Sequence, residues 1–589
     1  MNNLLGRNKP TKATSYFTDD DGAEIKDPKI IANRFNDFFT NIGPSLASKI
    51  PPPDATVLEH ILSSDSPADS LFFTPCTSEE VLKITSSLKP STSSGVDGIS
   101  SNLLKQIIPE IIDVLIHIFN CSLSTGIVPS KLKIAKVNPV FKSGDKHKFT
   151  NYRPISILPS ISKLLEKVVY TRIYDFITNH KILSPNQFGF RKNRSTYMAI
   201  NHLYDIITNA IDRKLYTVGI FLDLSKAFDT LDHSILLQKL NHCGIRGISN
   251  LWIENYLKGR RQFVVFDKTS SVTNTIHCGV PQGSILGPLL FLLYINDLPK
   301  CSSSLNFILF ADDTNIICSH DDPHTLEIIL NKDLHIISNW FKLNKLSLNV
   351  AKTNYMIFKN KYSPSASIDV NISIDNNQLG QVKTTKFLGI LIDDNLTWRT
   401  HTTHVCNIIS KYNGIIRKVK QFLPSESLPT LFNTLVYPYI NYCAIIWADN
   451  NNSHRDSILL LQKRIVRTCT NSMWLEHTNP LFQSLNTLKI QDIHCLQVGI
   501  FMYQFHHNLF PDDLLEPNYF TMNNEVHNYN TRGATNIRIG LVNTCLAYNT
   551  IRIQGALLWN ILPTSLKNSP SINVFKRSYK KILMSNYQS

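Results

Sequence analysis

The 589-residue chain predicts an α+β fold, and three observations lead to this class. Two short apolar runs, residues 217–223 and 305–313, have the composition of buried strands, and both end on aspartates. Patterns typical of helices with one buried face precede and follow these runs. With 43% hydrophobic, 10% aromatic and 18% charged residues, the chain is neither a disordered polymer nor a fibre.

Net charge is distributed unevenly along the chain. There are 60 Lys+Arg and 45 Asp+Glu residues, a net charge of +15. The first 120 residues carry a net −5 and the remainder +20, and residues 121–215 alone carry +11. Such a surplus favours a polyanionic partner, although a merely solvated face would have the same composition. At about 100 to 200 residues per domain, the length allows roughly three to five structural units.

The cysteines and the apolar stretches exclude several classes of protein. Eleven cysteines are scattered singly, so neither a disulfide framework nor a zinc knuckle is indicated. Residues 1–18 are polar and lack the apolar core of a signal peptide. Two uncharged stretches, residues 427–448 and 284–295, are interrupted by prolines or too short for a bilayer. We expect an intracellular protein, cytoplasmic or nuclear, without a membrane segment.

The elements follow in order from local signals. Residues 30–39 predict a short amphipathic helix, and a Pro/Ser/Asp-rich linker follows to about residue 70. Thr77 or Ser78 caps the next helix, with two glutamates in its first turn. After about residue 400 helical patterns dominate again. The remaining expected elements are helices at 81–88, 103–123, 234–240 and 289–298, and strands at 217–223 and 305–313.

Three aspartates at the strand ends are chemically costly. Asp223, Asp312 and Asp313 follow runs of Phe, Ile and Leu, where an ionised carboxylate loses water unless a cation compensates it. In a tight turn both neighbouring acids can reach one site, with the third arriving from an adjacent strand. Mg²⁺ prefers such oxygen ligands, and two ions about 4 Å apart suit nucleotidyl transfer; Mn²⁺ is the alternative. Taken alone, an Asp-Asp pair is more often a loop feature.

The strings around these acids add a resemblance. Residues 221–229 (FLDLSKAFD), 279–288 (GVPQGSILGP) and 310–313 (FADD) stand in that order. They resemble the palm motifs of the reverse transcriptases of non-LTR retrotransposons, the jockey-like group in particular. Residues 151–156 and 187–191 resemble the fingers motifs of the same family, and residues 349–353 and 386–390 resemble its last palm motifs.

The resemblance implies a right-hand polymerase with fingers, a palm built on an antiparallel sheet, a helical thumb and helical flanking segments. The expected parts are a partly disordered connector (1–75), an N-terminal helical extension of the fingers (76–120), the reverse transcriptase domain of fingers and palm (121–393), a helical thumb (394–480) and a C-terminal region of unknown role (481–589). Residues 529–533 and 558–563 resemble the tail of related elements.

The resemblance also implies roles for single residues. Asp223, Asp312 and Asp313 would be catalytic and hold two metal ions. Phe228 would exclude the 2′-hydroxyl, so that deoxynucleotides are preferred. Other nucleotide-binding residues would be Arg153, Lys142, Gln282, Gly283 and Lys352, the last near the leaving pyrophosphate. Phe387, Leu388 and Gly389 would form the primer grip, and the nucleic-acid backbone would meet Lys411, Arg417, Lys418 and Lys420.

The implied reaction adds dNTPs to a DNA 3′-hydroxyl on an RNA template, so the expected partners are RNA, a DNA primer or target and dNTPs. Elements of this family usually encode an endonuclease ahead of the polymerase, and no such domain fits here, which suggests a truncated copy or partial gene model. Two alternatives stay open: an inactive or co-opted nucleic-acid binding protein, and a maturase-type reverse transcriptase, for which no characteristic segment is evident.

Overall fold

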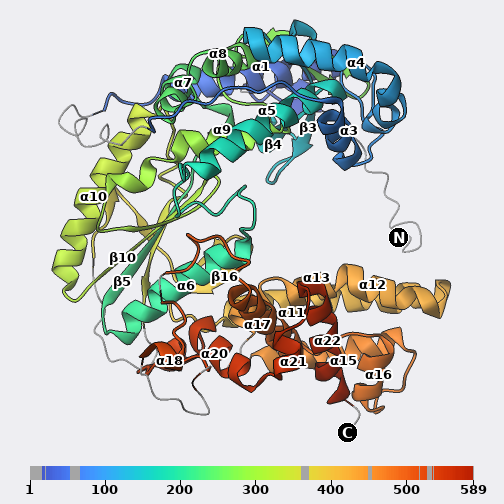
Figure 1. Cartoon of the computed structure of the whole chain (residues 1–589), viewed down its shortest axis with the longest axis vertical. Helices are drawn as coiled ribbons and strands as arrows, with labels where there is room; N and C mark the ends of the chain where they lie inside the picture. Colours follow the sequence, from blue (N-terminus) through green and yellow to red (C-terminus); the bar gives the residue numbers. More distant parts are fainter. Residues whose placement is uncertain are drawn as a thin grey trace.

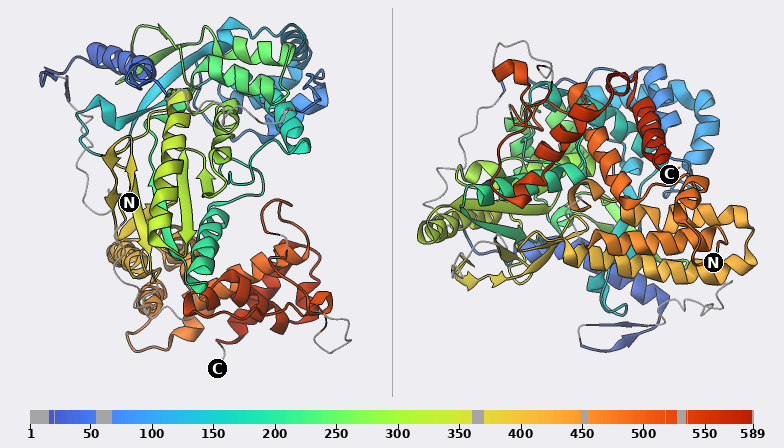
Figure 2. Two further views of the ribbon diagram at one scale, coloured as in Figure 1. Left: turned by 90° about the vertical axis from the view of Figure 1, so that its left-hand side faces the viewer. Right: turned by 90° about the horizontal axis from the view of Figure 1, so that it is seen from below.

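The computed structural model describes residues 16–19, 21–53, 67–359, 370–448, 454–516, 518–526, 534 and 536–587. Figure 1 shows the fingers at the top, the palm at the left, and the thumb and C-terminal region at the bottom. In the side view of Figure 2, the long palm helix α10 (Pro323–Leu343) runs between the fingers and the lower helices. The predicted linker partly, and residues 529–533 entirely, lie outside the described residues.

The palm is built on a five-stranded sheet in the order β14-β11-β5-β10-β9. Neighbouring strands are antiparallel except β11 and β14. Because β5 ends where β10 begins, the residue after β5 and the β9–β10 turn lie at one end of the sheet. The strands are β5 (Tyr216–Leu222), β9 (Asn306–Phe310), β10 (Asp313–His320), β11 (Asn354–Phe358) and β14 (Gly380–Gln381).

This sheet separates two hydrophobic cores because successive side chains of a strand point to opposite faces. Val218, Ile220 and Leu222 of β5 belong to the core that contains α9 (Leu286–Ile295) and α10. Phe221 belongs to the other core, with α6 (Thr196–Asp212). That second core continues without interruption into the thumb and the C-terminal region. The palm, thumb and C-terminal region are therefore packed as one body.

The fingers carry a second sheet in the order β4-β3-β6-β7, with β8 paired to β6. Helix α1 (Pro28–Ala47) packs on this sheet through Ile31, Phe35 and Phe39. The strands are β3 (Ile134–Phe141), β4 (Tyr152–Ile157), β6 (Arg261–Phe266), β7 (Thr269–Ser270) and β8 (Asn274–Thr275). The remaining helices of this part are α3 (Ser78–Ser87), α4 (Ser101–Thr125), α5 (Ser160–Asn179), α7 (His233–His242) and α8 (Ile248–Leu257).

Helices form the lower part of the molecule, below a hairpin of β15 (Thr384–Phe387) and β16 (Ile390–Asp393). The thumb helices are α11 (Arg399–Val419), α12 (Leu428–Leu435), α13 (Tyr437–Asn441), α14 (Ala444–Trp447) and α15 (Arg455–Cys469). The helices that follow are α16 (Thr478–Ser484), α17 (Ile490–His506), α18 (Asn523–Val526), α19 (Cys545–Tyr548), α20 (Ile551–Ile561), α21 (Thr564–Lys567) and α22 (Ile572–Ser585). There are also two small hairpins, β1 (Phe17–Thr18) with β2 (Glu24–Ile25) and β12 (Ser373–Ile374) with β13 (Asn377–Gln378), and several short 3-10 helices.

The expected α+β class is confirmed, and each expected helix and strand is present, although some bounds differ: the first helix, α1, is longer than the predicted 30–39, and the helix predicted at 289–298 ends at Ile295. Thr77 caps α3, accepting a hydrogen bond from the backbone of Glu80 at 3.3 Å. The strand expected at 305–313 ends at Phe310, because the following residues form a turn. Within the described residues one helix, α4, is long and apolar enough to cross a bilayer, with a mean hydropathy of 1.5. Its Leu104, Ile108 and Phe119 lie in the core of the fingers and palm.

Candidate active site

The acids Asp312 and Asp313 lie at a two-residue turn between β9 and β10. The strand register pairs Phe310 with Asp313, which leaves Ala311 and Asp312 at the turn. Ala311 has φ +57°, a left-handed conformation that costs a residue with a Cβ roughly 1–2 kcal/mol. Such strain persists only where the surroundings hold it in place. Two neighbouring carboxylates are thereby presented at the same end of the sheet.

Asp223 comes from the central strand at that same end. Leu222 pairs with Thr314 in the β5–β10 register, so Asp223 lies beside the start of β10. Asn349 holds it twice: its backbone N–H donates to the Asp223 carbonyl at 2.8 Å, and its side-chain amide donates to the carboxylate at 2.9 Å. The structure thus brings together the three acids that the sequence singled out.

The electrostatics of the three acids favour a cation. Loss of surrounding water, then the charges of Asp312 and Asp223, raise the pKa of Asp313 to about 6, although its side chain reaches solvent on one side. Burial likewise raises the pKa of Asp312. Among the described residues no three side chains are already gathered as a metal centre. Carboxylate oxygens that repel one another are nevertheless the donor set that a hard divalent ion compensates, so these residues fit such an ion.

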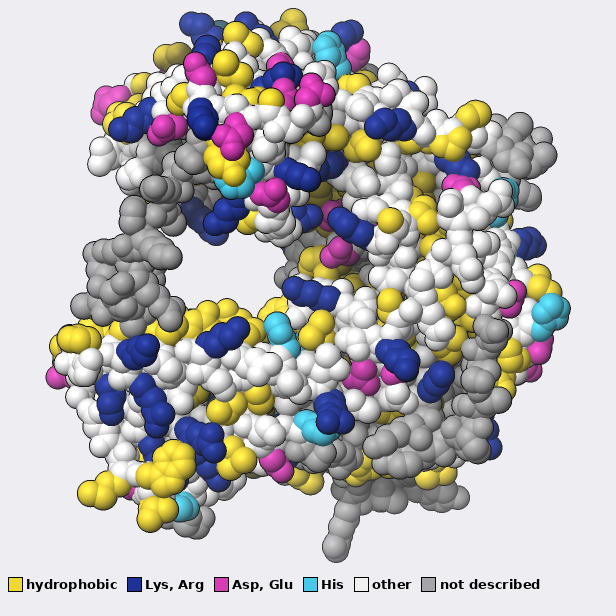
Figure 3. Space-filling view, turned by 180° about the vertical axis from the view of Figure 1, so that it is seen from behind, with side chains coloured by type: hydrophobic (Ala, Val, Ile, Leu, Met, Phe, Trp, Pro, Cys, Tyr) yellow, Lys and Arg dark blue, Asp and Glu magenta, His cyan; other side chains and the backbone are white. Residues whose placement is uncertain are grey.

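Basic side chains lie around the site. Arg153 and Lys142 act electrostatically on Asp312, and both, with Lys352, act on Lys226. Arg153 lies on β4, Lys142 just beyond β3, and Lys352 in the turn before β11. Figure 3 shows Lys and Arg side chains on the rim of the opening between fingers and thumb. The structure therefore brings Arg153 and Lys142 to the acids, whereas Lys352 lies near Lys226, to which sequence reasoning gave no role.

Lys226 occupies an unusual backbone position. It has φ +52°, three residues after Asp223, and its ammonium group approaches the Tyr152 carbonyl of β4 at 3.3 Å. Burial lowers the pKa of Lys226, while the charge of Asp229 opposes that change. The lysine therefore bridges the palm motif to the fingers strand. Its position within the string FLDLSKAFD was a signal that could have identified it.

The predicted sugar gate and its neighbours form an aromatic and polar wall. Phe228 stacks on Phe291 of α9, with ring centroids 4.5 Å apart, and meets exposed Phe190 edge-on at 6.3 Å. The Gln282 amide donates to both carboxylate oxygens of Asp229, at 2.9 and 3.0 Å. Burial raises the pKa of Asp229 to about 6, opposed by that amide. Asp229 is thus a fourth carboxylate near the site, which sequence reasoning did not assign.

Gly283 allows the fingers and palm to approach closely. Its φ is +115°, and a Cβ there would lie 2.7 Å from the Ser156 carbonyl of β4. The backbone N–H of Ser156 donates to the carbonyl of Gln282 at 2.8 Å. A side chain at position 283 would therefore separate β4, with its Arg153, from the palm.

The residues predicted as a primer grip form the β15–β16 hairpin turn. Leu388 and Gly389 both have positive φ, as a two-residue hairpin loop prefers. Tyr442 of the thumb donates to the Leu388 carbonyl at 2.6 Å. Phe387 is 2% exposed and packs in the core below the sheet, so it anchors the turn rather than reaching the surface.

The four predicted thumb contacts divide into two sets on and just beyond α11. Lys411 and Lys418 are exposed beside a groove of about 550 Å³ whose wall includes Tyr412 and Tyr439. Arg417 lies elsewhere on α11, and Lys420, directly after the helix, approaches Asn471 beyond α15 at 3.4 Å. The structure therefore does not bring all four together.

Comparison with known proteins gives a family for the central part of the chain. The family described as "Reverse transcriptase (RNA-dependent DNA polymerase)" matches residues 142–392. A protein named "Probable RNA-directed DNA polymerase from transposon X-element" of Drosophila melanogaster is 28% identical over 74% of this chain and 48% of its own length. The corresponding protein from transposon BS is 29% identical over 72% of this chain and 48% of itself.

A third relative, "RNA-directed DNA polymerase from mobile element jockey" of Drosophila funebris, is 26% identical over 71% of this chain and 46% of its own length. The chain spans about half the length of these curated relatives. A solved telomerase from Candida albicans, bound to a fragment of telomeric RNA, has 10% identity and a TM-score of 0.34 over 66% of this chain and 69% of its own. That likeness is too weak to carry an argument. Residues 142–392, which include the palm sheet and its three acids, are thus similar to the reverse transcriptase (RNA-dependent DNA polymerase) family.

Proposed function

We propose that this protein is the RNA-directed DNA polymerase of a non-LTR retrotransposon, which adds dNTPs to a DNA 3′-hydroxyl on an RNA template. One observation carries the proposal: Asp223, Asp312 and Asp313 converge at one end of the palm sheet of a reverse transcriptase domain. The relatives named above are RNA-directed DNA polymerases of transposons, which supports the same substrates here.

The three acids would hold two Mg²⁺ ions, with Mn²⁺ as the alternative. The chemistry that such ions supply is activation of the attacking hydroxyl and stabilisation of the leaving pyrophosphate. Asn349 orients Asp223 for this role through its two hydrogen bonds. The strained turn at Ala311 presents the other two carboxylates. The convergence of all three acids at one end of the sheet supports this assignment.

The surrounding side chains would hold the nucleotide. Arg153 offers a planar guanidinium that matches phosphate oxygens in pairs, Lys142 adds positive charge beside the acids, and Lys226 adds it beside Asp229. Lys352 would donate a proton to the departing pyrophosphate. The Phe228 ring, fixed against Phe291, would lie under the sugar and exclude a 2′-hydroxyl. These roles make the protein a DNA-synthesising enzyme rather than a general nucleotidyltransferase.

The opening between fingers and thumb would hold the template and primer. Lysines and arginines on its rim supply salt-dependent contacts to phosphates. The hairpin turn at Leu388 and Gly389, anchored to the thumb by Tyr442, would lie against the primer end. Lys411 and Lys418 beside the α11 groove would follow the duplex backbone.

A primer-extension assay on poly(rA)/oligo(dT) with purified protein tests the proposal. We expect synthesis by the wild-type chain and none by Asp312→Ala or Asp313→Ala, each with RNA binding largely intact. Asp321→Ala is the matched control, since Asp321 is an exposed acid at the other end of β10. Activity persisting in either active-site variant would contradict the metal assignment. A wild-type chain that binds RNA but never extends the primer would favour a co-opted nucleic-acid binding protein.

A further inference from the structure

The segment between α5 and α6 extends the palm sheet at the β9 edge. The backbone N–H of Phe188 donates to the Leu309 carbonyl at 2.8 Å, and the N–H of Leu309 donates to the Asn186 carbonyl at 2.9 Å. These residues therefore run parallel to β9 just before the turn that carries Asp312. Part of the sequence string that resembles a fingers motif thus lies against the palm.

Gln187 connects this segment directly to the turn. Its side-chain oxygen accepts hydrogen bonds from the N–H of Gly189 at 2.8 Å and from the N–H of Ala311 at 3.0 Å. Gln187 is 2% exposed, so water is a poor substitute for these bonds. Gly189 is equally constrained, because a Cβ there would lie 2.3 Å from the Ala311 nitrogen. Ala311, the turn residue in left-handed conformation, is therefore held in place by residues outside the turn.

Two arginines fix the backbone of the same segment. Arg191 donates to the Ser184 carbonyl at 2.8 Å, and Arg194 donates to the Pro185 carbonyl at 2.6 Å and the Gln187 carbonyl at 3.3 Å. The Arg194 side chain is fully buried and lies over the ring of Phe188. Two guanidiniums close together, one of them out of water, require an acid to compensate their charge.

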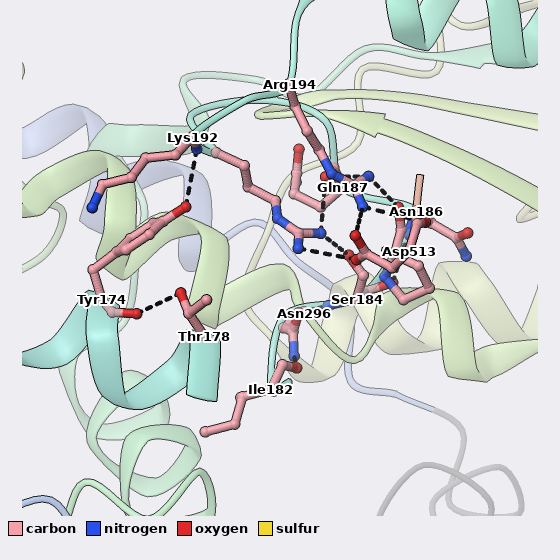
Figure 4. A network of polar contacts seen from close by, with 12 residues as sticks. Tyr174, Thr178, Ile182, Ser184, Asn186, Gln187, Lys192, Arg194, Asn296 and Asp513 are labelled. Atoms are coloured by element: carbon pink, nitrogen blue, oxygen red, sulfur yellow. Dashed lines mark hydrogen bonds and ion pairs between the residues drawn. The ribbon is translucent and has the colours of Figure 1, made fainter. Parts of the chain in front are cut away.

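That acid is Asp513, which Figure 4 shows beside Arg194 and Gln187. Asp513, in the segment between α17 and α18, pairs with Arg194 at 2.7 Å and with Arg191 at 3.1 Å. Partial burial favours a raised pKa of Asp513, yet the charges of Arg194 and Arg191 hold it below its ordinary value. Within the described part of the chain, Asp513 is the acid that pairs with both arginines.

We propose that Asp513 is a positioning residue for the catalytic turn: it fixes Arg191 and Arg194, they fix the Gln187 segment, and Gln187 holds Ala311 and thereby Asp312. The inference gives the C-terminal region a role in placing the acids, and for its catalytic consequence it rests on the proposed function. Other contacts of this region with α6 support the same docking, such as Tyr519 to Asp205 at 2.6 Å and Thr544 to Asp212 at 2.9 Å.

The test compares Asp513→Asn with Asp512→Asn, the same chemical change one residue earlier on an exposed side chain. Amide hydrogen exchange of a peptide spanning residues 305–316 reports the turn without needing activity. We expect at least about tenfold faster exchange there for Asp513→Asn than for the wild type and Asp512→Asn. If the turn exchanges at the same rate in Asp513→Asn as in Asp512→Asn, the inference is overturned. This outcome is informative even if the wild-type protein has no polymerase activity.

Steady-state primer extension separates positioning from loss of folded protein. We expect kcat per titrated active site to fall by about ten- to a hundredfold in Asp513→Asn, with the KM for dNTP nearly unchanged. Gln187→Met, which keeps side-chain volume but removes the acceptor, should have the same signature. The double variant should lose less than the product of the two single losses, since both act through Ala311. An unchanged kcat per active site, or losses that multiply, would refute the coupling.

Asp513→Glu keeps the negative charge, so it tests whether the effects of Asp513→Asn come from loss of the ion pairs or from poor folding. We expect it to recover most of the kcat and the slow exchange of the turn. Full recovery of the unfolding temperature without recovery of kcat or of the turn exchange would mean that Asp513 stabilises the fold only, and would contradict a positioning role.

Discussion

The palm and the thumb hold their charged residues in different ways. In the palm, Asp313 is flanked by two further acids and has its pKa raised to about 6, and Asp223 is fixed by Asn349. In the thumb, Lys411 and Lys418 lie exposed on one helix. A charge that has lost part of its water interacts strongly with its immediate neighbours. Exposed charges interact weakly, and their interaction energies are additive and depend on salt. Substitutions in the two regions should therefore change different measurable quantities.

The largest of these effects is expected from Phe228→Ala in the palm. Removing the ring that stacks on Phe291 opens space under the sugar, so discrimination against ribonucleotides should fall by roughly a hundredfold. Incorporation of rNTP and dNTP in single-nucleotide extension measures the ratio. Phe190→Ala is the control, because Phe190 is an exposed aromatic neighbour of the same ring. Unchanged sugar selection in Phe228→Ala would remove this residue from the gate.

A smaller effect concerns pH and the metal. Because the pKa of Asp313 is raised to about 6 in the folded chain without metal, the folded state holds a proton that the unfolded state lacks between about pH 4 and 6. The stability of the metal-free protein should therefore decrease as the pH rises through this window. Below pH 6 protons compete with the ion, so apparent Mg²⁺ affinity should weaken about tenfold per pH unit.

Thermal unfolding with EDTA or with millimolar Mg²⁺ at several pH values checks this expectation. The stabilisation by Mg²⁺ should grow from pH 5 to pH 7. Asp313→Asn is the informative control, since it leaves Asp229 and its raised pKa in place. In that variant the metal-free protein should gain stability at pH 7 and respond little to Mg²⁺. An equal response in both chains would place the ion elsewhere.

The smallest effect is expected in the thumb. Lys411→Gln with Lys418→Gln should weaken binding of an RNA–DNA duplex a few-fold, irrespective of sequence, and reduce the slope of log affinity against log salt by about one per lysine. Arg417→Gln with Lys420→Gln, at the end of the same helix and directly after it, is the matched pair and should change the slope less. If the Lys411→Gln, Lys418→Gln variant had a lower kcat but an unchanged slope of log affinity against log salt, the proposed difference between palm and thumb would be wrong.

The sequence allowed the palm to be predicted better than the contacts that stabilise it. Asp223, Asp312 and Asp313 were identifiable because a carboxylate at the end of an apolar strand violates an ordinary composition rule. The same strands fixed the α+β class. Lys226 and Asn349 stand inside recognised strings, yet their contacts depend on backbone angles and on a turn that periodicity does not reveal.

Other roles depended on tertiary packing. Helical spacing alone could have separated the four thumb residues into two sets. Lys411 and Lys418 are seven residues apart and therefore share a face of α11. Phe387 was expected at the primer end, but its ring is in the core, which only the packing of β15 determines. Asp513 lay beyond any local pattern, since 322 residues separate it from Arg191.

That separation along the chain has a consequence for synthesis of the protein. Every string that carries the chemistry has been translated by about residue 390, whereas Asp513 emerges more than a hundred residues later. At roughly 5 to 20 residues per second, the palm exists for several seconds before the acid that neutralises its two arginines is available. A nascent chain would therefore carry the three acids around a turn that is not yet held, until the segment with Asp513 has been made and has docked on the two arginines.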